Sequence, residues 1–161
     1  MKEFSELYRL YSEKIYKYLL YLTCNKHEAE ELLQETFFQA FKSISRFKGE
    51  SSISTWLFSI ARNVYLKKYN DDKKRDEISL ELENIIGVTK SPLDELEAKE
   101  EECRILKAIN LLDETYRQVV ILRSLNELSF REIGEILNKN ENWARVTFYR
   151  GKVKLGKELY P

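Results

Sequence analysis

Basic and aromatic side chains recur along the segment from Glu141 to Leu155 at a spacing that suits contact with nucleic acid. If the segment is a helix, with about 100° per residue, its polar arc faces away from a narrow apolar arc. The polar arc carries Asn142, Arg145, Val146, Tyr149 and Arg150, with Lys152 and Lys154 on its flanks. Guanidinium groups bind guanine edges and phosphates through paired hydrogen bonds. The pattern therefore indicates a DNA-contacting helix, and the alternative is a solvated basic face on a structural hairpin.

A second helix, which ends at a short polar break, is expected before this basic segment. Ser129 and Glu132 have the spacing of a capping box, which starts a helix by pairing its first free backbone amides. The helix should stop before Asn138-Lys139-Asn140. Two helices joined by such a break are typical of a helix-turn-helix, whose second helix enters a DNA groove.

A different kind of surface is expected nearer the start of the chain, where acidic and amide side chains share one helix face. That face carries Glu28, Glu31, Gln34, Glu35 and Gln39. Because carboxylates repel DNA phosphates, the face favours a basic protein surface as its partner. The plainer alternative is that the charges only keep a surface helix solvated.

The charges of the 161-residue chain sum to zero but are unevenly distributed. Six basic residues stand against one acid in 139–157, and six stand against two in 62–75. The stretch 76–102 holds ten acids and two bases. Phosphate binding depends on local cations, so two basic patches flanking an acidic connector are compatible with DNA binding. The connector would compete with phosphates, and we therefore expect the free protein to bind duplex DNA weakly.

The sequence offers little for catalysis, metal binding or membrane insertion. Cys24 and Cys103 lie far apart and His27 is the only histidine, so no zinc ligand set is visible. There is no glycine-rich phosphate loop and no nucleophile with a suitable base, so we expect no enzyme, cofactor or metal site. No apolar run approaches the roughly 20 residues that cross a bilayer. We expect a cytoplasmic protein without stable membrane insertion, in which both cysteines are reduced.

Apolar residues at three- and four-residue steps predict an all-α fold. A first helix is expected from Phe4 to near Asn25, and a second helix follows at once. The inward stripe of the second helix should comprise Ala29, Leu33, Phe37, Ala40, Phe41 and Ile44. A loop over 46–54 then leads to a third helix that reaches Tyr65. These three helices should form one compact bundle.

The helical periodicity fades after Tyr69, and the stretch 87–92 suggests a break between two units. Pro92 at a first helical position restarts a helix that runs to Leu112, and Asp113 begins another. Together with the helix-turn-helix, these form a second bundle. The expected organisation is a first helical domain over 1–72, an acidic linker over 73–91 and a second helical domain over 92–161.

Two groups of motifs carry a family resemblance. The first group is Glu28-Ala29-Glu30-Glu31-Leu32-Leu33-Gln34-Glu35-Thr36-Phe37, Phe47-Lys48-Gly49 and Thr55-Trp56-Leu57-Phe58-Ser59-Ile60-Ala61-Arg62-Asn63. It resembles region 2 of bacterial sigma-70-type factors. The second group is Leu111-Leu112-Asp113-Glu114, Val120-Ile121-Leu122-Arg123 and the helix-turn-helix from Leu128, and it is similar to region 4. With these two regions and a linker, nearly the whole chain resembles the extracytoplasmic-function (ECF) group of RNA polymerase sigma factors.

The resemblance implies that the first domain binds core RNA polymerase and helps to open promoter DNA. Docking on the polymerase would use Glu31, Leu32, Gln34 and Glu35. The loop and the third helix would read the minus-ten element, which requires groups that hold an unstacked base and cations along the backbone. The matching residues are Phe47, Gly49, Ser51, Trp56, Arg62, Asn63 and Lys67. The apolar neighbours of Trp56 favour a place in the core over base stacking.

The resemblance also implies that the second domain reads the minus-thirty-five element with the helix after the turn. The matching residues are Lys139, Asn142, Trp143, Arg145, Val146, Thr147, Tyr149, Arg150 and Lys152. Of these, Arg145, Val146, Thr147 and Arg150 would read bases, and Lys139 and Lys152 would contact phosphates. The chain departs from the family pattern at Trp143, where a small hydroxyl residue is usual, and at Gly151, where alanine is usual. Trp143 could stack on the sugar-phosphate edge or bury against Leu125.

The resemblance implies three partners: core RNA polymerase, promoter DNA and an anti-sigma factor that inhibits the protein. The function that it implies is promoter recognition and strand opening at transcription initiation. One alternative is an autonomous helix-turn-helix regulator that binds its operator as a dimer, although no dimerisation helix is evident. Another is a sigma-like polymerase adaptor that reads no promoter, which a loss of activity on replacing Arg145 and Arg150 would count against.

Overall fold

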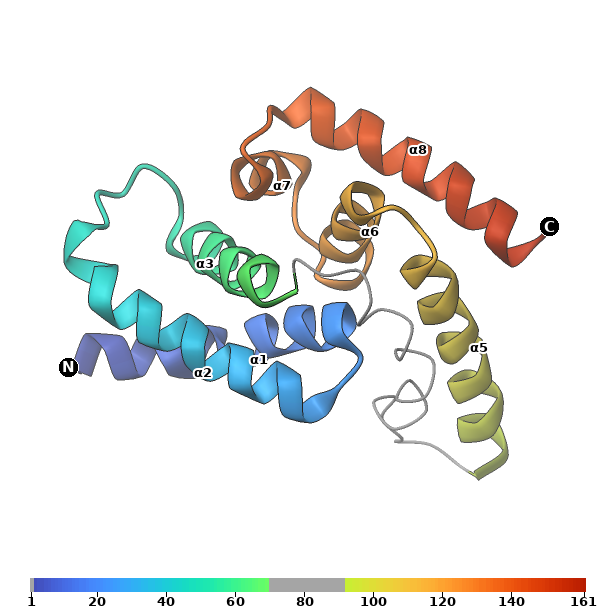
Figure 1. Cartoon of the computed structure of the whole chain (residues 1–161), viewed down its shortest axis with the longest axis horizontal. Helices are drawn as coiled ribbons and strands as arrows, with labels where there is room; N and C mark the ends of the chain where they lie inside the picture. Colours follow the sequence, from blue (N-terminus) through green and yellow to red (C-terminus); the bar gives the residue numbers. More distant parts are fainter. Residues whose placement is uncertain (1, 70–91) are drawn as a thin grey trace.

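The computed structural model describes residues 2–69 and 92–161, and all regular structure within these ranges is helical (Figure 1). The expected all-α fold is thus confirmed. The helices form two bundles, α1 to α3 and α5 to α8, which lie against each other. The expected linker over 73–91 and the last residues of the expected first domain lie outside the described residues.

The first bundle consists of three helices and a short 3-10 turn before the loop. Its elements are α1 Lys2–Thr23, α2 Lys26–Ser43, η1 Ile44–Arg46 and α3 Ile53–Lys68. Asn25 starts α2 by accepting a hydrogen bond from the Glu28 amide, and Ser52 starts α3 by accepting one from the Thr55 amide. Such caps satisfy backbone N–H groups that the first turn of a helix leaves without partners.

The inward face of α2 differs from the expected stripe. Its buried residues are Ala29, Leu32, Thr36, Phe37 and Ala40. Phe41 and Ile44, which were expected inside, are 47% and 37% exposed. The difference arises because Thr36 can be buried: its hydroxyl donates to the Leu32 carbonyl one turn earlier at 2.7 Å. A hydroxyl that donates a hydrogen bond within its own helix lowers the free-energy cost of its burial. The buried face of α2 is therefore rotated towards Leu32 and Thr36.

The second bundle is built around the long C-terminal helix. Its elements are α5 Pro92–Asn110, α6 Glu114–Val120, a π-helical turn η3 Ile121–Leu125, α7 Phe130–Leu137 and α8 Glu141–Leu159. α8 packs against α5, α6 and α7 (Figure 1). A Cβ at Gly151 would lie 2.9 Å from Val120 Cγ2, so the missing side chain at Gly151 lets α8 approach α6 closely.

The turn between α7 and α8 has the expected helix-turn-helix form. The predicted capping box is present, with the Glu132 amide donating to Ser129 Oγ at 3.1 Å and the Ser129 amide donating to the Glu132 carboxylate at 3.0 Å. Asn138 ends α7 in the left-handed conformation, with φ 59°, which asparagine adopts more readily than most residues. Asn140 then caps α8 by accepting from the Trp143 amide at 2.7 Å.

Gly134 allows this turn to fold back onto α7. A Cβ at Gly134 would lie 2.7 Å from the Lys139 carbonyl oxygen and 2.9 Å from the Asn140 carbonyl oxygen. The Lys139 amide also donates to the Gly134 carbonyl at 2.7 Å. Because the opposing atoms belong to the backbone, a larger residue would have to displace the turn itself.

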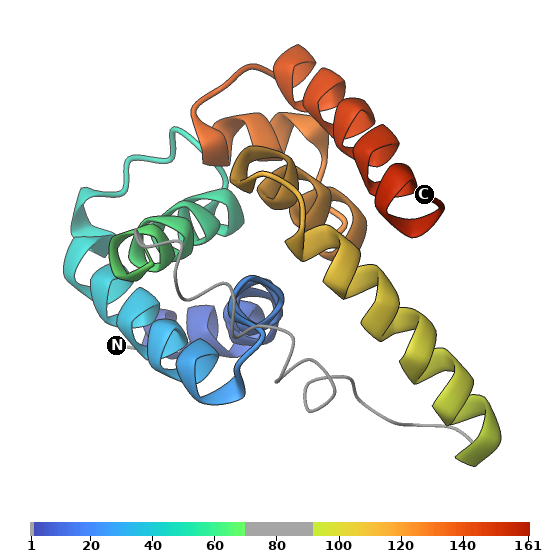
Figure 2. The same ribbon diagram turned by 45° about the vertical axis from the view of Figure 1, so that its right-hand side comes forward.

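The two bundles meet along a surface that we call the seam. There α3 lies against α7, and α1 contacts η3 (Figures 1 and 2). The apolar core runs through the seam without interruption, since Ile15 and Leu57 belong to the same buried cluster as Val119 and Ile133. Figure 2 shows α5 extending away from this shared core. Within the part of the chain that is described, no helix is both long enough and apolar enough to span a membrane.

Candidate nucleic-acid interface

The outer face of α8 presents the polar arc that its spacing predicted. Its exposed residues are Asn142, Arg145, Val146, Tyr149, Arg150, Lys152 and Lys154. The opposite arc is buried, as expected, at Ala144, Phe148 and Gly151. A shallow groove of about 570 Å³ follows the exposed face, with Tyr116 of α6 on one side. An exposed helix with cations on one face, placed directly after the turn, is the arrangement that enters a major groove in helix-turn-helix proteins.

Arg145 is oriented by an aromatic ring and a carboxylate. Its guanidinium lies 3.2 Å from the Glu141 carboxylate and 5.4 Å from the centre of the Phe130 ring. Arg123 approaches the same ring at 4.1 Å. Cations are attracted to aromatic faces at such distances, so Phe130 links α7 to the outer face of α8. The Arg145 side chain remains 45% exposed and is therefore accessible to a base edge.

Two residues expected to contact DNA lie closer to the protein interior. Thr147 is 7% exposed and belongs to the buried side of α8. Trp143 is half-buried against the core, with the Lys139 ammonium 5.7 Å from the centre of its ring. Trp143 also lines a small cavity together with Arg62 and Leu66 of α3. In this structure Trp143 therefore contacts protein at the seam.

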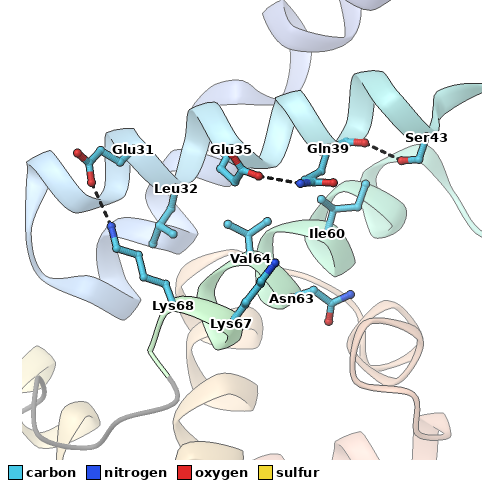
Figure 3. A pocket seen from close by; sticks show the side chains of 10 residues that line it. All are labelled: Glu31, Leu32, Glu35, Gln39, Ser43, Ile60, Asn63, Val64, Lys67 and Lys68. Carbon is cyan, nitrogen blue, oxygen red and sulfur yellow. Dashed lines mark hydrogen bonds and ion pairs between the residues drawn. The ribbon is translucent and has the colours of Figure 1, made fainter.

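A second surface of interest is a groove of about 760 Å³ between α2 and α3 (Figure 3). Its α2 wall is formed by Glu31, Leu32, Glu35, Gln39 and Ser43. Its α3 wall is formed by Ile60, Asn63, Val64, Lys67 and Lys68. Acidic and amide groups thus face basic groups across a narrow apolar floor. Residues expected to bind polymerase and residues expected to bind DNA lie on the two walls of one groove.

An ion pair joins the two walls at one end of the groove (Figure 3). Lys68 Nζ donates to one Glu31 carboxylate oxygen at 3.0 Å, and His27 Nε2 lies 3.1 Å from the other. The Lys68 hydrogen bond and charge, followed by the charge of His27, lower the pKa of Glu31. Lys68 was expected, together with Lys67, to supply cations along the DNA backbone, and in this structure it is paired with Glu31.

The loop before α3 brings two aromatic rings together. The ring centres of Phe47 and Trp56 are 5.0 Å apart, and both side chains are half-buried. Trp56 packs against the core, as its apolar neighbours favoured. Gly49 is exposed at the tip with φ 75°, a conformation that glycine adopts at no steric cost. Ser51 is half-buried in the loop.

Arg62 and Leu32 occupy positions that their sequence pattern did not reveal. Arg62 lies on the side of α3 that faces the second bundle, and its Nε atom is buried without a hydrogen-bond partner among the residues that the structure describes. Leu32 is 3% exposed, so it supports the acidic face of α2 from below. Gln34 and Glu35 are exposed on that face, and Asn63 and Lys67 are exposed on α3.

Sequence reasoning missed a buried polar network across the seam. Arg117 and Gln118 of α6 are 0% and 2% exposed. Arg117 donates from Nη1 to the Leu22 carbonyl at 3.0 Å and from Nη2 to the Tyr65 hydroxyl. The Tyr18 hydroxyl donates to Gln118 Oε1 at 2.6 Å. The only signal in the sequence was a pair of polar residues interrupting an apolar run.

Comparison with known proteins identifies both bundles. The family model "Sigma-70 region 2" matches residues 7–75, and "Sigma-70, region 4" matches residues 104–155. The ECF RNA polymerase sigma factor SigM of Bacillus subtilis is 33% identical over 160 residues, which cover 96% of this chain and 93% of SigM. The ECF RNA polymerase sigma factor SigW of the same organism is 32% identical over 165 residues, which cover 97% of this chain and 88% of SigW.

A solved structure has the same fold over almost the whole chain. The sigma factor RpoE from Bartonella quintana, in complex with the anti-sigma factor NepR, matches with a TM-score of 0.72 at 21% identity. The match covers 99% of this chain and 98% of that chain.

Two helical bundles that match regions 2 and 4 define a sigma-70-type transcription initiation factor. Within that class, the chain belongs to the family of ECF RNA polymerase sigma factors. Its function is therefore to bind core polymerase, direct it to promoters and promote strand opening when transcription starts.

Proposed function

We propose that this sigma factor divides its work among three surfaces of the described structure. The acidic face of α2, with Glu31, Gln34 and Glu35, docks on a basic surface of core RNA polymerase. The loop and α3 read the minus-ten element, and the outer face of α8 reads the minus-thirty-five element. The observation that carries the proposal is the presence, on one chain, of an exposed acidic helix face and a cationic helix that follows a complete helix-turn-helix turn.

At the minus-ten element, Asn63 and Lys67 are the groups best placed to act. Both are exposed on α3 at the groove in Figure 3, where an amide can pair with an unstacked base and an ammonium can follow the backbone. Phe47, Gly49 and Ser51 shape the loop that receives a flipped base. Trp56 and Leu32 support these surfaces from the core. Arg62 would contact phosphate.

At the minus-thirty-five element, some exposed side chains of α8 contact base edges and so recognise the sequence, and others contact the phosphate backbone and so position the helix. Arg145, Val146 and Arg150 face the base edges. The residues that contact the backbone are Lys139, Asn142, Tyr149 and Lys152. Thr147 and Trp143 hold the helix in place from its inner side.

An anti-sigma factor is a further proposed partner, since RpoE of Bartonella quintana, a protein of the same fold, is bound to one. Such an inhibitor would keep the sigma factor from core polymerase until it is needed. The protein would act in the cytoplasm, where the polymerase works, and as an initiation factor without catalytic turnover of its own.

The docking face can be tested by charge reversal. Glu35→Lys should abolish co-migration of the chain with purified core polymerase in gel filtration, because it places a cation against a basic surface. Glu13→Lys is the matched control, since Glu13 is an exposed acid on α1 whose side chain is 80% accessible. If both variants bind core polymerase as the wild type does, α2 is not the docking face.

A further inference from the structure

The Phe130 ring, at the start of α7, is contacted by two arginine side chains from different elements. The guanidinium of Arg123, in the π-helical turn η3, lies 4.1 Å from the centre of the ring. The guanidinium of Arg145, on the outer face of α8, lies 5.4 Å from the same centre. Aromatic faces attract cations at these distances. Phe130 therefore joins the elements that precede and follow α7.

Several contacts fix the position of this ring. Phe130 is the first residue of α7 and directly follows the serine of the capping box. Its ring packs against Phe148 on the inner face of α8, with ring centres 5.6 Å apart, and Phe148 is only 9% exposed. Arg123 is anchored as well, since its Nη1 atom donates to the Leu128 carbonyl at 3.0 Å. The ring is thus a fixed support on which the Arg145 side chain rests.

Phe130 restrains Arg145 without forming a hydrogen bond to it. A guanidinium carries five N–H donors, and a ring face attracts its charge while leaving those donors able to pair elsewhere. The Arg145 side chain is 45% exposed, whereas the side chain of Arg131, which pairs with Glu135 at 3.6 Å on α7, is 81% exposed. Arg145 is therefore held closer to the protein surface than an arginine that has only a carboxylate beside it on a helix.

We propose that Phe130 is a positioning residue for promoter reading, because its ring holds the Arg145 guanidinium in the direction from which that group recognises a base pair of the minus-thirty-five element. This inference rests on the proposed function of Arg145 as a base reader. Paired hydrogen bonds to a guanine edge require one orientation of the guanidinium plane. A guanidinium without the ring could also turn towards a phosphate, so it would still bind DNA but discriminate less between base pairs.

The test measures discrimination between base pairs in transcription. Core polymerase with the full chain transcribes a promoter that it recognises and every single-base variant of the minus-thirty-five element of that promoter. The base pair that Arg145 reads is the one whose preference disappears in Arg145→Ala. The discrimination ratio at each base pair is the transcript yield from the original promoter divided by the mean yield from its variants. A loss of folded protein lowers both yields and leaves this ratio unchanged.

Phe130→Leu should lower the ratio about two- to fivefold at the base pair that Arg145 reads, which corresponds to the loss of one exposed cation–π contact. Ratios at the other base pairs should keep their wild-type values, whereas a displaced α8 would lower all of them. Phe130→Tyr keeps the ring and should retain the wild-type ratio. If Phe130→Leu loses its helical circular dichroism signal, Phe130→Met takes its place with the same expectation.

Tyr160→Leu is the matched control. Arg104 lies 5.4 Å from the centre of the Tyr160 ring and 3.2 Å from the Glu101 carboxylate, the same distances at which Arg145 meets its ring and its carboxylate. The control removes a contact of the same geometry between α5 and the residue that follows α8. It should leave the ratio unchanged at every base pair.

The outcomes separate this inference from the proposed function. A wild-type ratio in Phe130→Leu, an equal loss at every base pair, or the same loss in Phe130→Tyr would overturn the positioning role and leave Arg145 as a base reader. If Arg145→Ala changes no preference, or if the chain and core polymerase recognise no promoter, the proposed function fails and the inference fails with it.

Discussion

Arg145 lies at the exposed start of α8, where its guanidinium pairs with the Glu141 carboxylate. In the proposed function it exchanges this carboxylate for a guanine edge. Replacing Arg145 by alanine should lower transcription from a cognate promoter by roughly 5- to 150-fold, since one such base contact is worth about 1–3 kcal/mol. The loss should disappear on a promoter whose minus-thirty-five element has been replaced. Run-off transcription on the two promoters measures both effects.

Arg9→Ala is the matched control for this prediction. Arg9 pairs with Glu6 at 2.9 Å on the surface of α1, much as Arg145 pairs with Glu141. An exposed ion pair of this kind contributes little to stability, so Arg9→Ala should transcribe as the wild type does. Equal losses in the two variants would show that Arg145 does not read DNA.

Burial raises the pKa of the Cys24 thiol to about 11, although Arg117 and Asn110, which face it, partly offset the effect. Because the pKa is raised in the folded chain, the stability that this group contributes is present below about pH 8.5, the value for a free thiol. That stability is lost as the pH rises towards 11. The alkylation rate of Cys24 should therefore reach its midpoint near pH 11 in the wild type. A midpoint near about 8.5 would show that the thiol is exposed.

The sequence predicts the exposure of some side chains better than the burial of others. The outward positions of Arg145 and Arg150 follow from helical spacing alone, because an exposed side chain needs no partner. The burial of Arg117 depends on Leu22 and Tyr65, which lie far away along the chain, so no local pattern contains it. The same holds for Arg62, whose sequence context is that of an exposed cation while its Nε is buried at the seam.

At the scale of elements, the turn of the helix-turn-helix depends on the missing side chain at Gly134. Gly134→Ala should destabilise the chain by about 1–3 kcal/mol, because the new Cβ would press on the Lys139 and Asn140 carbonyl groups. Urea unfolding followed by circular dichroism measures this change.

Gly156→Ala, in the neighbouring helix α8, should raise the stability of the chain, in contrast to Gly134→Ala. Within residues 2–69 and 92–161, nothing lies within 4 Å of a Cβ at Gly156, so alanine should stabilise α8 by about 0.5–1 kcal/mol through its helix propensity. If both variants are stabilised, the close approach at Gly134 does not hold in solution.

The helices were largely predictable from the sequence because residues close to each helix end determine where the helix begins and stops. Ser129 and Glu132 formed the expected capping box, and α7 ended at Asn138, the first residue of the expected break. The face of α2 was less predictable, since Thr36 is buried with its hydroxyl bonded to its own helix, whereas Phe41 is 47% exposed. An analysis of hydrophobic periodicity treats threonine as a surface residue, and it cannot detect that the Thr36 hydroxyl finds its acceptor within the same helix.

For the whole molecule, the zero net charge disfavours binding of the free chain to DNA. We expect the isolated protein to bind a promoter duplex weakly, with an affinity that falls further between about 50 and 200 mM salt. Fluorescence anisotropy with labelled duplex at several salt concentrations measures this. Tight, salt-resistant binding by the isolated chain would contradict the expectation.

The arrangement of the bundles could not be read from the sequence. The motifs indicate two regions in order, but the contacts of α3 with α7 and the link between Tyr18 and Gln118 are tertiary. Their formation depends on how two amphipathic surfaces meet in space, and composition or spacing does not encode that directly. The seam therefore appears only in the structure.

If this chain directs core polymerase to promoters, adding it to core polymerase must create new transcript starts. Purified core polymerase would transcribe a pool of genomic promoter fragments with and without the protein, and the transcript starts would be sequenced. We predict new starts that share two spaced sequence motifs upstream. Binding to core polymerase without new starts, or protection of duplex DNA without core polymerase, would show that the chain does not direct the polymerase to promoters.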